Sequence, residues 1–146
     1  MNYCIYLSRA TQAMSQDDLT TLIEGCIDHN NQNDLTGLLM YKGPLSSEGD
    51  AYFMQLLEGP SEQLEQLKTK IKVDARHTDF VILEEGEVES RTFPKWSMGL
   101  RHVDDAKYAG QEGYADLASP DFWSRAQNGE LENMLSVMQF FSDEDV

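Results

Sequence analysis

Hydrophobic and polar positions alternate over residues 3–8, and this two-residue period is typical of a strand. The period then lengthens, because the apolar residues from Leu19 to Ile27 recur at helical spacing. Ser15 and Asp18 form an acidic variant of the capping box just before this stretch. The pattern therefore predicts a strand followed by a helix that begins after Ser15 and ends near Asn30.

The rest of the first hundred residues predicts four more strands and a second helix. The strands are expected over residues 35–41, 52–58, 80–83 and 96–100. The helix is expected to start with Ser61 as its N-cap, and its buried stripe consists of Leu64, Leu67 and Ile71. Residues 42–51 are rich in Gly, Pro and Ser and indicate an exposed loop. The order β-α-β-β-α-β-β predicts an α+β, ferredoxin-like sandwich, in which a five-stranded mixed sheet carries both helices on one face.

The second face of this sheet needs a cover too, because apolar residues fall on both faces of the predicted strands. Residues 119–129 and 130–141 look like two short helices and are too apolar for a free tail. We expect these C-terminal helices to cap the second face and to offer a surface for self-association or for a partner. The predicted division is a sheet-and-helix domain over residues 1–102 and a helical extension over 103–146.

Composition narrows the class of protein. The chain has 146 residues, 40% of them hydrophobic, which suits one globular domain with a real core. Its formal net charge of −15 predicts repulsion from nucleic acid and from anionic membrane surfaces. The sequence has neither a membrane-spanning apolar stretch nor the features of a signal peptide. Cys4 and Cys26 lack metal-type spacing, so we expect buried, reduced thiols in a cytoplasmic protein without a metal.

Motifs for common kinds of catalysis are missing from the sequence. It contains neither a G-x-S-x-G nucleophile elbow nor a glycine-rich phosphate loop, so we do not expect an enzyme. Polar residues do occur where apolar ones are expected, with Tyr6 inside the first strand and Gln55 inside the third. If these strands are neighbours, the Tyr6 hydroxyl and the Gln55 amide share the helix-covered face and can hydrogen-bond each other.

The other candidate residues also have ordinary structural explanations. Asn30 can cap the first helix at its C-terminus, and Arg76 and His77 suit the negative end of the second helix dipole. Trp96 and Met98 read as core residues. Taken together, however, the polar groups surround a space between two helices and a sheet. This arrangement favours binding of a flat heteroaromatic molecule over acid–base catalysis, because amides and arginine offer hydrogen bonds without titrating near neutral pH.

Five segments occur in the order and spacing of a known family. They are CIYLSR, HNNQNDLTGLLMY, FMQLLEGP, DARH and RTFPKWSMGL. Over about residues 1–102 the chain resembles BLUF domains, the blue-light sensors that use flavin. The resemblance implies that FAD, or alternatively FMN or riboflavin, binds non-covalently between the two helices.

The resemblance also implies roles for individual residues. The photoactive set is Tyr6, Gln55, Trp96 and Met98, and the last two differ among family members in their placement near the glutamine. The polar contacts to the flavin are assigned to His29, Asn30, Asp74, Arg76 and His77. The apolar wall around the ring is assigned to Leu22, Ile23, Cys26, Leu39, Phe53 and Ile71.

The light response of the family is a rearrangement of hydrogen bonds. By resemblance, Tyr6 donates an electron and then a proton by way of Gln55, whose amide ends rotated or tautomerised. A stronger hydrogen bond to the flavin carbonyl then shifts the absorption to the red. The fifth strand, expected to hold Trp96 and Met98, passes the change to the C-terminal cap. The 42–51 connection is longer than the tight turn usual in the family and is expected to project from the sheet.

The 44 residues after the matched region are too few for an output domain. We therefore expect a short stand-alone BLUF protein that signals as a homo-oligomer or to a downstream protein. Two other interpretations stay open. One is a small ferredoxin-like hydrolase of the acylphosphatase type, in which Arg and Asn bind phosphate. The other is a light-independent interaction module that acts through its acidic C-terminal cap.

Overall fold

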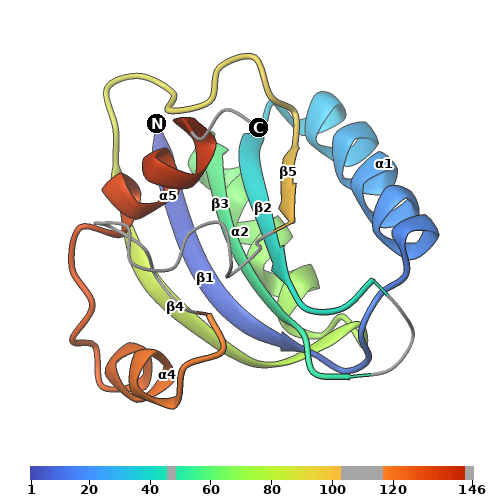
Figure 1. Cartoon of the computed structure of the whole chain (residues 1–146). Coiled ribbons are helices and arrows are strands. Elements are labelled where there is room, and N and C mark those ends of the chain that lie inside the picture. The colour runs from blue at the N-terminus through green and yellow to red at the C-terminus, as the bar shows by residue number, and fades with distance from the viewer. Residues whose placement is uncertain (46–48, 103–116, 144–146) are drawn as a thin grey trace.

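The computed structural model describes residues 1–45, 49–102 and 117–143, and over these ranges the predicted sandwich is confirmed. The strands are β1 (Asn2–Ala10), β2 (Thr36–Lys42), β3 (Tyr52–Gly59), β4 (His77–Glu87) and β5 (Gly99–His102). The helices are α1 (Gln16–Asn33), α2 (Ser61–Lys72), α4 (Pro120–Gln127) and α5 (Met134–Asp143). The sheet order is β4-β1-β3-β2-β5, with antiparallel pairs except for the parallel β2–β5 pair (Figure 1). The sheet is therefore mixed, as the sequence predicted.

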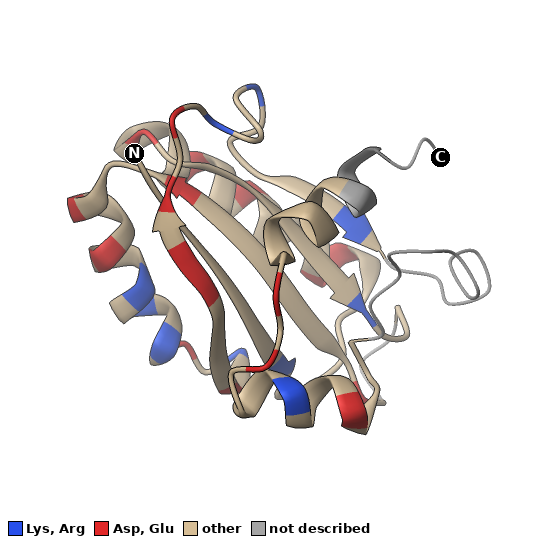
Figure 2. Ribbon diagram, turned by 90° about the vertical axis from the view of Figure 1, so that its left-hand side faces the viewer, with Lys and Arg blue, Asp and Glu red and all other residues tan. Residues whose placement is uncertain are grey.

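The helices form a layer on each side of the sheet. Helices α1 and α2 lie against one face and α4 and α5 against the other, and a side view shows α2 and the two C-terminal helices on opposite sides (Figure 2). Alternate residues of β1 serve the two faces: Ile5 and Leu7 pack with the C-terminal helices, and Cys4 and Tyr6 pack with α1 and α2. Two cores therefore share one sheet. The connection between β2 and β3, where the longer loop was predicted, lies partly outside the described residues.

The C-terminal helices cover the second face as predicted. Phe122 and Trp123 of α4 and Met134 and Met138 of α5 are buried against apolar side chains of β1, β2 and β3. The expectation that residues 130–141 form one helix was too broad at its start, because α5 begins at Met134. No helix within the described ranges has the length and apolar character needed to cross a membrane. Nor do the described residues include a group of three or more His, Cys, Asp or Glu that could hold a metal ion.

Helix α1 begins as predicted and ends later than predicted. Ser15 and Asp18 form the capping box, with hydrogen bonds of 3.1 Å in both directions. The helix continues to Asn33 and closes on Asp34, whose left-handed φ of 58° and N–H bond to the Asn30 carbonyl complete the C-cap. Asn30 is therefore a buried residue of the last turn, and the expectation that it caps the helix was wrong.

The second helix and the strand after it also differ from the sequence expectation. Pro60, not Ser61, occupies the N-cap position of α2, which makes Ser61 the first helical residue. Because α2 ends at Lys72, Arg76 lies in the connection beyond the helix and His77 opens β4. Arg76 pairs with Asp74 beyond the helix, whereas the His77 ring contacts the carbonyl of Ile71 in the last turn of α2, so of the two it is His77 that meets the C-terminal end of the helix as predicted. Strand β4 is also longer than the predicted residues 80–83, since it pairs with β1 over most of its length.

The fifth strand begins after the residues that were expected to form it. Trp96 and Met98 lie in the segment before β5, which itself starts at Gly99. The segment joins the sheet through one backbone hydrogen bond, from the Gly37 N–H to the Trp96 carbonyl at 3.0 Å. A Cβ on Gly99 would lie 2.7 Å from the Trp96 ring, so a side chain there would clash with the indole. The local geometry thus places Trp96 over the start of the strand.

Candidate functional site

A cavity of about 350 Å³ lies between α1, α2 and the face of the sheet that they cover. Of the residues predicted from the sequence, its wall contains Tyr6, Leu22, Cys26, His29, Asn30, Leu39, Phe53, Gln55, Ile71, Asp74, Arg76, His77 and Met98. Ile23 and Trp96 are not in the wall. The wall is mostly apolar with a few convergent polar groups, which is the composition of a small-molecule site.

The cavity exists because α1 stands away from the sheet in the middle of its length. Leu22 and Cys26 point toward the sheet and yet are only half-buried. A Cβ added to Gly25 would meet no atom within 4 Å, which shows how open the helix surface is there. The expectation that both thiols are buried is therefore confirmed for Cys4 and wrong for Cys26, which is half-buried, and both thiols are free. Such a gap in a close-packed interior is the space that a flat ligand would fill.

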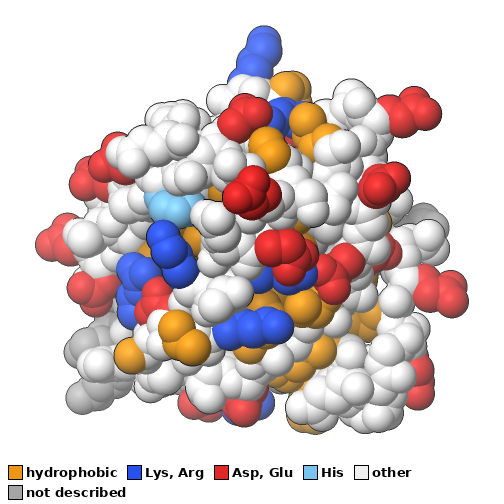
Figure 3. Space-filling view, turned by 180° about the vertical axis from the view of Figure 1, so that it is seen from behind, with side chains coloured by type: hydrophobic (Ala, Val, Ile, Leu, Met, Phe, Trp, Pro, Cys, Tyr) orange, Lys and Arg blue, Asp and Glu red, His pale blue; other side chains and the backbone are white. Residues whose placement is uncertain are grey.

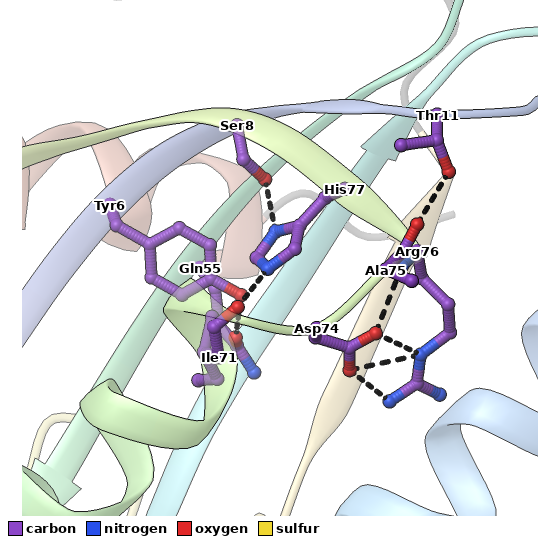
Figure 4. A network of polar contacts seen from close by, with 9 residues as sticks. All are labelled: Tyr6, Ser8, Thr11, Gln55, Ile71, Asp74, Ala75, Arg76 and His77. Carbon is purple, nitrogen blue, oxygen red and sulfur yellow. Dashed lines mark hydrogen bonds and ion pairs between the residues drawn. The ribbon is translucent and has the colours of Figure 1, made fainter.

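Tyr6 and Gln55 lie at the floor of this cavity and touch each other. They are cross-strand partners in the antiparallel β1–β3 ladder, so their side chains leave the sheet on the same face. The Tyr6 hydroxyl donates a hydrogen bond to Gln55 Oε1, and each residue is 4% exposed (Figure 4). Phe80 stacks on the Tyr6 ring with the centroids 4.7 Å apart. The pairing expected from the sequence is therefore present and buried.

The other end of the Gln55 amide contacts Met98. Gln55 Nε2 donates to Met98 Sδ at 3.4 Å, and Met98 is 6% exposed. Trp96 lies on the opposite side of the sheet, where its ring stacks on Phe93 at 5.2 Å and an interplanar angle of 9°. The sequence left open which member of the pair adjoins Gln55, and the structure places Met98 there.

The end of α1 supplies the polar groups of one rim. Asn30 is 1% exposed, and its Nδ2 donates to the Ser97 carbonyl at 2.6 Å. His29 Nδ1 lies 3.4 Å from Asn30 Oδ1. Both side chains line the cavity, and both lie in the last turns of α1, which ends at Asn33. The amide of Asn30 thus connects α1 to the segment that carries Met98.

The opposite rim is built from the connection between α2 and β4. Arg76 Nε lies 3.0 Å from Asp74 Oδ1, and the two side chains form an ion pair (Figure 4). His77 Nδ1 lies 2.8 Å from Ser8 Oγ, and its Nε2 contacts the Ile71 carbonyl. The hydrogen bonds from Arg76 hold the pKa of Asp74 below its ordinary value, and Asp74 in turn raises the pKa of Arg76. Asp74 and Arg76 therefore both stay charged, and the net charge of the pair is zero.

Burial suppresses acid–base chemistry on the floor of the site. It raises the pKa of Tyr6 well above its usual value of 10.0, and it also raises the pKa of the Cys26 thiol. Tyr6 thus stays a neutral hydrogen-bond donor, and Cys26 stays a protonated thiol with little nucleophilic character. What these residues can do chemically is exchange hydrogen bonds, since the Gln55 amide has a donor end and an acceptor end.

The cavity wall also contains residues that were not predicted as site residues: Gly25, Leu57, Leu67 and Lys70. Leu67 belongs to the apolar stripe of α2, so the sequence predicted that it faces the interior. Lys70 carried no sequence signal, because a lysine on an exposed helix position looks like ordinary surface. It becomes part of the site through the orientation of α2. The face that carries α1 and α2 shows apolar and basic side chains exposed beside acidic ones (Figure 3).

Comparisons with known proteins point to one family. The family model described as BLUF, sensors of blue-light using FAD, matches residues 1–99. The chain is 35% identical over 94 residues to photoactivated adenylate cyclase subunit beta of Euglena longa, which covers 64% of this chain and 10% of that protein. It is 38% identical over 71 residues to the blue light- and temperature-regulated antirepressor BluF of Escherichia coli strain K12, which covers 49% of this chain and 16% of that protein. The chain thus spans only a small part of the length of these relatives.

A solved structure supports the fold. The dark-state structure of BlrB, a BLUF protein, superposes with a TM-score of 0.67 at 24% identity. The superposition covers 88% of this chain and 92% of that one. At this identity the likeness shows that the two chains share their architecture.

Proposed function

This chain belongs to the BLUF family, and from that premise we propose that it is a blue-light photoreceptor that holds FAD in the cavity between α1 and α2. One observation carries the proposal: Tyr6, Gln55 and Met98 form a buried chain of contacts in the cavity wall. The bound flavin would supply absorption of blue light and a site that accepts an electron. The protein residues supply the rest of the response, and no acid–base catalysis is needed for it.

The residues that line the cavity suit the chemistry of a flavin. Its apolar wall, which includes Leu22, Leu39 and Ile71, suits the faces of a planar ring. Asn30 and Gln55 can offer hydrogen bonds to ring edges, and the Asp74–Arg76 pair could do so from the other rim. The half-buried inner side of α1 would become buried when the ring binds, which favours binding through the hydrophobic effect.

In this proposal Tyr6 donates a proton, and the Gln55 amide changes its hydrogen bonds as a result. The Tyr6 O–H bond points at Gln55 Oε1, so a proton that leaves Tyr6 after the loss of an electron arrives at that oxygen. When the electron returns from the flavin and Tyr6 regains a proton, Gln55 would be left rotated or tautomerised. Its Nε2 end is weakly held, because the thioether of Met98 is a weak acceptor. Reversal of the amide therefore breaks one strong contact and one weak one, as a bistable element requires.

The cavity wall supports a phosphorylated flavin, FAD or FMN, over riboflavin. Because Asp74 neutralises Arg76, Lys70 is the charged wall residue left to meet an anion. Its exposed ammonium on α2 suits a phosphate that extends from the cavity toward solvent. The acylphosphatase-type alternative gains no support, since Arg76 is held by Asp74.

We also propose that the response leaves the site through Met98 and reaches the C-terminal helices across β5 and the sheet. Those helices pack on the face opposite to the cavity. The relatives named above are a photoactivated cyclase subunit and an antirepressor, so in this chain the output would be a change of assembly or of a downstream contact. Size-exclusion chromatography of dark and illuminated protein tests this step. An identical elution volume in both states and no light-dependent partner would support the light-independent module instead.

Absorption spectroscopy of the purified protein tests the proposed function itself. We expect a yellow protein whose flavin spectrum shifts reversibly to the red under blue light. Released cofactor, identified by mass, would show whether it is FAD, FMN or riboflavin. A colourless preparation that takes up none of the three would contradict the proposal.

A further inference from the structure

Glu58, at the end of β3, is a buried carboxylate that faces away from the cavity. It is 0% exposed and accepts hydrogen bonds from three groups. The backbone N–H groups of Thr92 and Phe93 donate to Oε2 and Oε1 at 2.8 and 2.7 Å. The Thr36 hydroxyl donates to Oε1 at 3.1 Å. Removing a carboxylate from water costs free energy, and the hydrogen bonds that Glu58 accepts offset this cost.

Arg91 fastens the same segment to the ends of β2 and β3. Its Nη1 donates to the Glu58 carbonyl at 3.2 Å and to the Thr36 hydroxyl oxygen at 2.9 Å. Its Nη2 donates to the Asp34 carbonyl at 2.8 Å and forms an ion pair with the Asp34 carboxylate at 2.9 Å. The start of the segment between β4 and β5 is therefore attached through both a side chain and the backbone.

The rest of this segment, residues 93–98, places Met98 next to Gln55. Phe93, held by Glu58, stacks on Trp96. The carbonyl groups of Trp96 and Ser97 then accept hydrogen bonds from the Gly37 N–H at 3.0 Å and from Asn30 Nδ2 at 2.6 Å. Met98 follows and accepts from Gln55 Nε2. A shift at Thr92 and Phe93 would thus be carried to Met98 through a few short links.

We propose that Glu58 is a positioning residue for the light response, because its carboxylate sets the position of Met98 against the Gln55 amide from the other face of the sheet. This inference rests on the proposed function for its link to light, and on the described contacts for the link to Met98. The geometry calls for a glutamate side chain and not for a glutamine. Two successive N–H groups donate to two different oxygens, and an amide has only one oxygen to accept them.

The test compares Glu58→Gln with the matched control Glu84→Gln in the full-length protein. Glu84, on β4, accepts from the Tyr3 hydroxyl at 2.9 Å and from the Met134 N–H at 3.3 Å, and thus serves α5 instead of the Met98 segment. The first readout is the carbon-13 methyl signal of Met98, assigned with Met98→Leu. We expect Glu58→Gln to move this signal and Glu84→Gln to leave it in place. An unmoved Met98 signal in folded Glu58→Gln overturns the proposal.

The second readout is the rate at which the illuminated protein returns to the dark state. We expect Glu58→Gln to change this rate about fivefold, the factor that corresponds to one ordinary hydrogen bond. In a Met98→Leu background the same substitution should change it much less, because the contact through which Glu58 acts is gone. An equal change in both backgrounds contradicts action through Met98.

If Glu58→Gln does not fold, a second variant tests the same proposal. Thr36→Val keeps the carboxylate and removes the hydroxyl that bonds both Glu58 and Arg91. It should move the Met98 signal in the same sense, and an unmoved signal would overturn the proposal. The methyl signal does not need bound flavin. If the protein binds none, the proposed function fails while the positioning of Met98 by Glu58 is still decided.

Discussion

The Tyr6 hydroxyl donates to Gln55 Oε1 across the β1–β3 ladder, where the two residues are direct partners. Their side chains meet because antiparallel pairing sends opposite residues to the same face of a sheet. Gln55 then reaches Met98 with its amide nitrogen, so a single side chain joins a strand partner to the segment before β5. Removal of either the Gln55 amide or the Tyr6 hydroxyl is therefore expected to interrupt this chain of contacts.

Gln55→Leu is expected to keep flavin bound and to abolish the reversible red shift. The apolar wall remains, while the amide that would exchange its bonds is removed. Absorption spectra before and after blue light measure both properties. The matched control is Gln66→Leu, which removes an exposed amide from α2. A normal red shift in Gln55→Leu would contradict the proposed role of the amide.

Tyr6→Phe is likewise expected to retain flavin and lose the red shift, because the ring stays and the proton donor is gone. The control is Tyr41→Phe, another buried tyrosine of the same core, whose hydroxyl bonds Met14 N and the Pro44 carbonyl at 2.8 Å. This control should lower the free energy of unfolding by about 1–2 kcal/mol and keep the red shift. Equal spectral behaviour of the two variants would refute the assignment of Tyr6.

Lys70→Gln should weaken binding of FAD and FMN more than binding of riboflavin. The ammonium is an exposed part of the cavity wall, so we expect a modest effect of about 0.5–1 kcal/mol, or two- to fivefold in Kd. Fluorescence titration with the three flavins measures it. Lys72→Gln is the control, because Lys72 is not among the residues of the cavity wall. Its ammonium lies over the Phe80 ring, 5.7 Å from the ring centroid. An equal loss for riboflavin would argue against a phosphate contact.

The stability of the protein is expected to fall at alkaline pH. Burial, with a smaller effect of Glu85, raises the pKa of the Cys4 thiol from 9.0 to about 12. Between pH 9 and 12 the unfolded chain has therefore lost a proton that the folded chain keeps. The free energy of unfolding then decreases with rising pH, by up to about 1.4 kcal/mol per pH unit for this group. Urea unfolding at several pH values should show a shallower decline for Cys4→Ala, and an unchanged slope would contradict this origin.

Arg9→Gln should loosen α4 from the sheet. The Arg9 guanidinium lies 5.2 Å from the Trp123 ring centroid and 5.4 Å from that of Tyr52, and it pairs with Asp79 at 3.3 Å. Loss of these contacts is expected to lower the free energy of unfolding by about 1 kcal/mol. Amide hydrogen exchange in α4 should rise in this variant. Arg125→Gln, an exposed residue of α4, is the control and should leave the exchange unchanged.

Local patterns were sufficient to predict the elements and the general form of the sheet. The two-residue period of β1 and the capping box at Ser15 are set by neighbouring residues, so they can be read without the fold. Element ends were less predictable. The end of α1 depends on the left-handed conformation of Asp34, and β5 begins late because Trp96 lies over Gly99. Asp34 is bound by Arg91, and the Trp96 carbonyl accepts a hydrogen bond from the Gly37 N–H, so both ends also depend on residues distant in the sequence.

The sequence by itself determined a two-faced sheet with a polar pair, Tyr6 and Gln55, on the strands that face two helices. The residue types and their periods are enough for that, because side chains alternate along a strand. Only the tertiary structure decided that Met98, and not Trp96, adjoins Gln55, and that Lys70 belongs to the cavity wall. It also decided that Glu58 holds the Met98 segment. These relationships join residues far apart in the chain, and no local period encodes such distances.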